Sequence, residues 1–207
     1  KGVPHDPLCI LLGTLLWNFF TEATIIGMGS VVGKGDLIRK ISIPRYLTVL
    51  SSSTSALINL GINMCVVFLF TVINGVSFSW RTALLPLIII ELFAFSTALG
   101  FFLSALYVKY RDVTYIWEVG LQAAFYATPI LYPLTAVAEH FQKYFFINPV
   151  AQIIQDARYV TVTPSTITVW NCAPVRFALI PLGIVGLMIF ISRIYFKNQA
   201  KWFAENV

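Results

Sequence analysis

Five long apolar stretches constrain the fold of this chain more than any other feature of its sequence. Each is long enough to cross the roughly 30 Å hydrocarbon core of a bilayer as a helix. The composition agrees, because 58% of the residues are hydrophobic and 11% are charged, a balance unlike that of a soluble domain. The predicted spans are residues 8–32, 46–73, 82–108, 113–131 and 175–194. We therefore predict an all-α integral membrane protein whose residues 1–207 form one transmembrane domain.

The distribution of lysine and arginine predicts the orientation, since basic residues in short loops stay on the cytoplasmic side. If the polar segment 33–45 lies inside, the short inner loops and the tail hold most of the basic side chains. These are Lys34, Arg39, Lys40, Arg45, Lys109, Arg111, Arg193, Lys197 and Lys201. We therefore expect a multi-pass protein with a cytoplasmic C-terminus. Its net charge of +5 is then expected to face anionic lipid and not nucleic acid.

The polar segment between the first two apolar stretches predicts a short amphipathic helix over residues 36–43. Asp36 can cap its N-terminus, and Pro44 stops it. Apolar and basic residues fall on different faces of this helix. Its side chains are Asp36, Leu37, Ile38, Arg39, Lys40 and Ile41. Such a helix on the basic side of a membrane can rest on lipid headgroups or dock into a soluble partner, and the pattern leaves both possibilities open.

Residues 132–174 are too many for a hairpin and too interrupted to span the membrane. Two short helices are predicted at about 135–160, with Asn148 as the N-cap and Pro149 at the first position of the second helix. In that helix an apolar stripe lies opposite a polar face, which consists of Gln152, Gln155 and Asp156. We expect these helices on the outer side as re-entrant or interfacial elements, which are tolerated where protein or water covers them.

Polar side chains recur at helical spacing within the predicted spans, where such groups are costly and usually face the interior of a helix bundle. We predict that they line a shared polar path. The candidates are Asn18, Glu22, Asn59, Asn63, Tyr115, Glu118, Gln122 and Tyr126. The alternative is that they form hydrogen bonds between helices and only pack the bundle.

Catalytic and metal-binding motifs are absent from the sequence, which has no HExxH, no GxSxG and no cysteine pattern for a metal. The segment 27–35 approaches a phosphate-binding loop, but Met28 replaces its first glycine and Gly35 replaces the magnesium-binding Ser or Thr. We therefore expect no metal site, no bound ATP and no enzymatic activity of the chain by itself. An intramembrane enzyme that uses Glu22, Glu91 or Glu118 is a less favoured alternative.

Several short motifs occur in an order that identifies a family resemblance over nearly the whole chain. They are Val3-Pro4, Trp17-Asn18-Phe19-Phe20, Asp36-Leu37-Ile38-Arg39-Lys40, Ile43-Pro44-Arg45, Ala98-Leu99-Gly100, Tyr110-Arg111-Asp112-Val113, Thr128-Pro129-Ile130-Leu131-Tyr132-Pro133 and Asn148-Pro149. This order resembles the permease subunit of ABC-type polysaccharide and polyol-phosphate exporters, the O-antigen and teichoic-acid export permeases. Similar permeases have six spans, so we expect this chain to lack an N-terminal helix and the first span.

The resemblance implies a role for each segment. Residues 36–43 would be the coupling helix to a separate ATPase subunit, with Tyr110, Arg111 and Asp112 as a second contact. An outer gate would comprise Pro129, Tyr132, Pro133, Asn148 and Pro149.

The resemblance also implies the assembly and the cargo. The permease would be a homodimer in the bacterial cytoplasmic membrane with two ATPase subunits, which would bind ATP and magnesium. The cargo would be a polyprenyl-diphosphate-linked polysaccharide or a teichoic-acid-type polymer. The alternative within the same transporter type is an exporter of small hydrophobic molecules or drugs.

Overall fold

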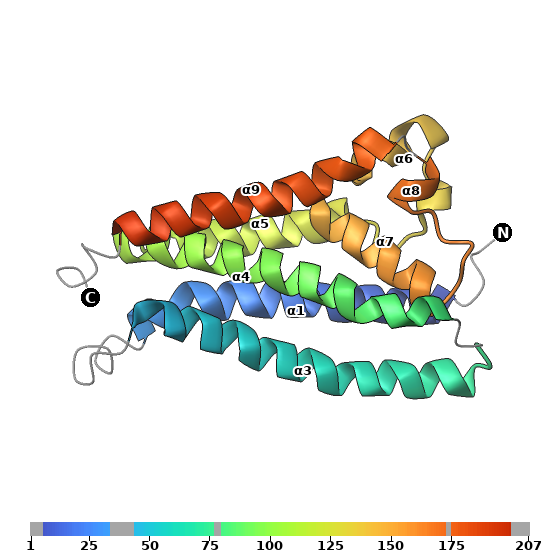
Figure 1. The fold of residues 1–207 in the computed structure, drawn as a ribbon, viewed down its shortest axis with the longest axis horizontal. Helices are drawn as coiled ribbons and strands as arrows, with labels where there is room; N and C mark the ends of the chain where they lie inside the picture. The colour runs from blue at the N-terminus through green and yellow to red at the C-terminus, as the bar shows by residue number, and fades with distance from the viewer. Residues whose placement is uncertain (1–5, 34–43, 77–79, 173–174, 200–207) are drawn as a thin grey trace.

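The computed structural model describes residues 6–33, 44–76, 80–172 and 175–199, and in this part of the chain every regular element is a helix (Figure 1). Four long helices run roughly along the same axis: α1 (Asp6–Gly33), α3 (Arg45–Ile73), α4 (Leu85–Lys109) and α9 (Val175–Gln199). The shorter ones are η1 (Trp80–Leu84), α5 (Val113–Ala127), η2 (Leu134–Ala136), α6 (Glu139–Phe145), α7 (Pro149–Thr161) and α8 (Val169–Cys172). The all-α prediction is confirmed for these residues.

Four helices are long and apolar enough to cross a membrane, and each coincides with a predicted span. They cover Pro7–Gly33, Arg45–Ile73, Trp80–Lys109 and Phe177–Gln199. Prolines lie near the starts of two of them, where a missing N–H costs little: Pro44 precedes α3, and Pro86 lies in the first turn of α4.

The predicted span 113–131 is not confirmed as a membrane-crossing helix. The helix in this region, α5, has 15 residues and ends at Ala127. At 1.5 Å per residue it is about 22 Å long, shorter than the hydrocarbon core. The predicted range is four residues too long because the apolar run continues to Leu131, although Thr128 is already extended and Pro129 follows it. The structure thus supports four of the five predicted spans.

The core of the bundle lies around α1, which packs against α3 on one side and α4 on the other (Figure 1). Glycines allow the backbones of α1 and α4 to approach closely: a Cβ atom on Gly27 would lie 3.4 Å from the Cα atom of Gly100. Small residues at such crossings are typical of membrane helices. Gly27 therefore serves close helix packing, whereas a Cβ on Gly29 or Gly33 would meet nothing within 4 Å.

The segment before α9 contains two short helices in the predicted region, α6 and α7. The predicted cap is present, since the side chain of Asn148 accepts a hydrogen bond from the backbone N–H of Val150 at 3.0 Å. The polar face of α7 is not exposed, however. Gln152, Gln155 and Asp156 are all buried, because α1, α4 and α9 contact α7.

One end of the bundle collects the chain segments that the sequence places on the cytoplasmic side. The last residues of α1, α4 and α9 and the first residues of α3 and α5 all lie there (Figure 1). Helices α6 and α8 lie at the other end. The predicted coupling helix, residues 36–43, falls outside the described residues.

Candidate functional site

A groove between α1 and α5 brings together half of the residues predicted to line a polar path. It encloses about 450 Å³ and is open along one side. Asn18 contributes from α1, and Glu118, Gln122 and Tyr126 contribute from α5. All four side chains are exposed on the described chain, so the groove offers an amide, a carboxylate, a second amide and a phenol to whatever lies against it.

Aromatic contacts hold α5 against α1 and form the apolar base of this groove. The ring of Trp17 lies 5.8 Å from that of Phe125 in an edge arrangement, and Phe20 lies 6.4 Å from Trp117. The indole N–H of Trp117 also donates to the hydroxyl of Thr24 at 3.3 Å. Such aromatic pairs add to the stabilisation that comes from burial. They fix the register of α5 and thereby the position of its polar face.

The other predicted path residues lie elsewhere. The Asn59 amide donates to the Glu22 carboxylate at 2.7 Å and so joins α3 to α1. This pair fits the alternative to a polar path, in which the polar residues form hydrogen bonds between helices. Asn63 is exposed on α3, and Tyr115 is 71% exposed near the start of α5, outside the groove.

The turn between α4 and α5 carries the second predicted contact with an ATPase. Tyr110, Arg111 and Asp112 are all exposed at the end of the bundle where α1 and α9 finish. The guanidinium of Arg111 lies 5.3 Å from the ring centre of Tyr107, a cation–π distance. These side chains are therefore accessible to a partner.

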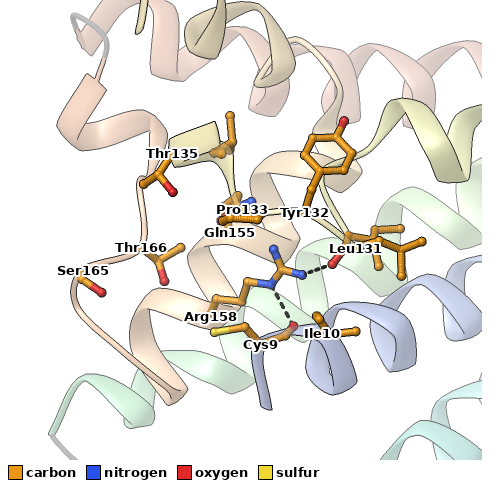
Figure 2. A pocket seen from close by; sticks show the side chains of 12 residues that line it. Cys9, Ile10, Leu131, Tyr132, Pro133, Thr135, Gln155, Arg158, Ser165 and Thr166 are labelled. Carbon is orange, nitrogen blue, oxygen red and sulfur yellow. Dashed lines mark hydrogen bonds between the residues drawn. The ribbon is translucent and has the colours of Figure 1, made fainter. Parts of the chain in front are cut away.

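At the opposite end of the bundle, Arg158 of α7 joins three parts of the chain (Figure 2). Its side chain is buried. Nε donates to the carbonyl of Cys9 at 2.9 Å, Nη1 to that of Pro129 at 2.8 Å, and Nη2 to that of Ile130 at 2.6 Å. The planar guanidinium, which carries several fixed donors, suits such a set of acceptors. We call this arrangement the Arg158 clamp; it ties α7 to the start of α1 and to the turn that follows α5.

A glycine in α1 makes room for the clamp. A Cβ atom on Gly13 would lie 2.6 Å from Nη2 of Arg158 and 3.3 Å from its Cζ. Contacts below 3.0 Å force a shift, so a residue larger than glycine would displace the guanidinium. Beside the clamp lies a small cavity of about 110 Å³, to which Tyr132, Pro133 and Gln155 contribute (Figure 2).

The residues predicted for an outer gate cluster around the clamp. Pro129 supplies one of its carbonyls, and Pro133 lies half-buried at the cavity. The Tyr132 hydroxyl donates weakly to the backbone of Tyr126 at 3.4 Å. Asn148 donates to the Thr128 hydroxyl at 3.0 Å, so the start of α7 is bound to the end of α5. Pro149 is buried at the first position of α7.

A second cluster of polar side chains lies between α4 and α7. Gln152 donates to Asp156 at 2.7 Å, and Glu91 of α4 faces the same region. Burial raises the pKa of Asp156 to about 6, and the hydrogen bond from Gln152 offsets only part of that rise. Asp156 therefore keeps its proton at mildly acidic pH, where an ordinary aspartate is already ionised, and the neutral form is less costly to enclose.

Sequence reasoning missed both Arg158 and Gly13 as structural partners. One signal was present: Arg158 follows Ile154 by four positions and therefore lies on the apolar stripe of α7, where a charged residue is unusual. Its acceptors could not be found this way, because they are backbone carbonyls of distant segments.

Comparisons with known proteins agree with the resemblance seen in the sequence. A family model described as "ABC-2 type transporter" matches residues 3–162. The chain is similar to the O-antigen export system permease protein RfbA of Myxococcus xanthus, with 24% identity over the whole chain and 78% of the relative. A relative with the same description from Klebsiella pneumoniae is 28% identical over 91% of this chain and 73% of the relative. A second Klebsiella pneumoniae relative is 26% identical over 73% of this chain and 59% of its own length.

Proposed function

The chain belongs to the ABC-2 type transporter family, and on that premise we propose that it is the permease subunit of an ATP-driven polysaccharide exporter. The cargo would be a polyprenyl-diphosphate-linked polysaccharide or a teichoic-acid-type polymer, crossing the bacterial cytoplasmic membrane. The relatives described as O-antigen export permeases support this cargo class.

The groove between α1 and α5 is the observation that carries the proposal. Sugars present hydroxyl groups at their edges and apolar faces on their rings. The amides of Asn18 and Gln122 and the carboxylate of Glu118 can hydrogen-bond the former, and the ring of Tyr126 can pack against the latter. A purely apolar cargo, as in the alternative of a drug exporter, would leave these polar groups without partners.

The groove is open on one side, and we propose that a second copy of the permease completes the conduit. Two ATPase subunits would bind ATP and magnesium and dock at the end of the bundle that carries Tyr110, Arg111 and Asp112. The family resemblance implies that residues 36–43 would make the first contact with each ATPase. This end would be cytoplasmic, as the basic residues predict, and the Arg158 clamp would then lie near the outer surface.

Leucine substitutions in the groove test the proposed path. Gln122→Leu with Tyr126→Leu removes an amide and a phenol from an exposed surface, so expression and assembly with the ATPase should be unchanged. Export should fall, because the cargo loses polar contacts in transit. Lipid-linked polymer should then accumulate on the cytoplasmic side of the membrane, measured by surface labelling of polymer in intact and permeabilised cells.

A matched control is Phe190→Leu, which alters an aromatic side chain that is 62% exposed on α9, away from the groove. It should export normally. If the groove variant also exports at the wild-type rate, or fails to accumulate in the membrane, the α1–α5 face packs the assembly and does not line the conduit.

A further inference from the structure

A second groove lies on a different face of the protein, between α4 and α9. It encloses about 670 Å³, and its surface is almost entirely apolar. On α4 it extends from Ile90 to Phe101, a distance of about 16 Å along the helix axis. Both walls belong to helices that are long and apolar enough to span the membrane, so the groove faces the lipid region.

Basic side chains lie at one end of this groove. Arg193 and Lys197 both line it from α9 and are exposed. They lie in the last turns of α9, at the end of the bundle where the sequence predicts the cytoplasm. Tyr46, at the start of α3, also lines the groove and is 53% exposed. Tyrosine favours the boundary between headgroups and acyl chains, where its ring is apolar and its hydroxyl is wet.

One buried polar side chain in the groove indicates a ligand that carries a hydrogen-bond acceptor. Thr97 of α4 lines the groove and is 8% exposed, yet its hydroxyl has no hydrogen-bond partner among the described residues. Threonines in helices commonly satisfy their hydroxyl on the preceding turn, as Thr71 does through the carbonyl of Val67. The Thr97 hydroxyl is instead able to donate to a ligand. It lies one turn from Phe101, on the side of Ile90 and away from Lys109 at the end of α4.

We propose that the α4–α9 groove binds one anionic phospholipid of the cytoplasmic leaflet. Its phosphate contacts Arg193 and Lys197, a glycerol ester carbonyl accepts from Thr97, and an acyl chain fills the apolar length as far as Ile90. The charges are complementary, since that leaflet is rich in anionic lipids and basic pockets between membrane helices bind their headgroups. This site is separate from the α1–α5 groove, and the proposal does not depend on the cargo.

Native mass spectrometry of the full permease in detergent tests this site, with phosphatidylglycerol and phosphatidylcholine as probes. The wild-type protein should retain one phosphatidylglycerol per chain at concentrations where phosphatidylcholine does not bind. Arg193→Gln with Lys197→Gln should weaken phosphatidylglycerol binding by roughly 10- to 30-fold, given the usual contribution of two basic residues near a membrane surface. Ala94→Phe, which fills the groove without changing charge, should reduce binding of the same lipid.

A charge-matched control is Lys109→Gln with Arg111→Gln, at the same end of the bundle but outside the groove. It should retain the bound lipid. Equal loss in both double variants would mean general electrostatic attraction and would overturn the proposal. Equal binding of both phospholipids would also overturn it. So would displacement of phosphatidylglycerol by an equimolar polyprenyl phosphate, which would make the groove a site for the cargo's lipid carrier.

Discussion

The Arg158 clamp leads to a prediction about two glycines in the same helix. Gly13→Ala should destabilise the protein, whereas Gly29→Ala should leave it equally or more stable. Replacing a helical glycine by alanine by itself gains up to about 1 kcal/mol. At Gly29 nothing lies within 4 Å of the new Cβ, so that gain should be realised.

At Gly13 the gain is opposed by the guanidinium. The new Cβ would lie 2.6 Å from Nη2 of Arg158, and the arginine is held by hydrogen bonds of 2.6–2.9 Å to three carbonyls. Overpacking a buried site costs roughly 1–3 kcal/mol. A hydrogen bond from a charged donor contributes about 1.5–3 kcal/mol, part of which is lost when the donor shifts. We expect Gly13→Ala to be less stable than Gly29→Ala by roughly 2–5 kcal/mol.

The measurement is unfolding of the purified permease in mixed micelles with a rising fraction of SDS, followed by tryptophan fluorescence. Arg158→Gln provides a second comparison. It should be destabilised, because the carbonyls of Pro129 and Ile130 lose their charged donor. In that background Gly13→Ala should cost less, because the clashing group is gone and the two changes are coupled. Equal stability of the two alanine variants, or strict additivity with Arg158→Gln, would refute the clamp as described.

Three further predictions address other parts of the molecule. Gly100→Leu should destabilise the α1–α4 crossing by roughly 1–3 kcal/mol in the same assay, because its Cβ would already lie 3.7 Å from the Cα of Gly27; Gly61→Leu, where nothing lies within 4 Å, should not. The contribution of Asp156 to the free energy of unfolding should fall by roughly 2–3 kcal/mol between pH 4 and 7, because its raised pKa favours the neutral form in the folded state and that contribution is lost as pH rises through about 6. Asp156→Asn should be more stable at pH 7 and lack this part of the pH dependence; an unchanged profile would contradict the assignment. Leu37→Asp should lower both co-purification of the ATPase and export, because a charge would be buried at their interface. Normal export with the ATPase bound would mean that residues 36–43 only rest on lipid.

Hydropathy and helical spacing by themselves determine much of the architecture. Four of the predicted spans, and the cap at Asn148 with Pro149 after it, follow from local sequence and are present in the structure. Local signals suffice here because a helix satisfies its own backbone hydrogen bonds, and the bilayer admits few other solutions. The sequence also predicted that Asn18, Glu118, Gln122 and Tyr126 line a shared polar path, and the structure brings these four side chains into one groove.

The tertiary structure decided what local patterns do not encode. The apolar run that begins at Val113 continues past Ala127, so hydropathy by itself predicted a span to residue 131, although Pro129 marks the end of α5 in the sequence. The polar face of α7 is buried because three helices contact that short element, whereas amphipathic spacing by itself indicates one exposed side. Arg158 takes its acceptors from carbonyls 149, 29 and 28 positions away. Every residue has such a carbonyl, so no side-chain pattern marks these three, and only the packing of α7 against α1 and the end of α5 selects them.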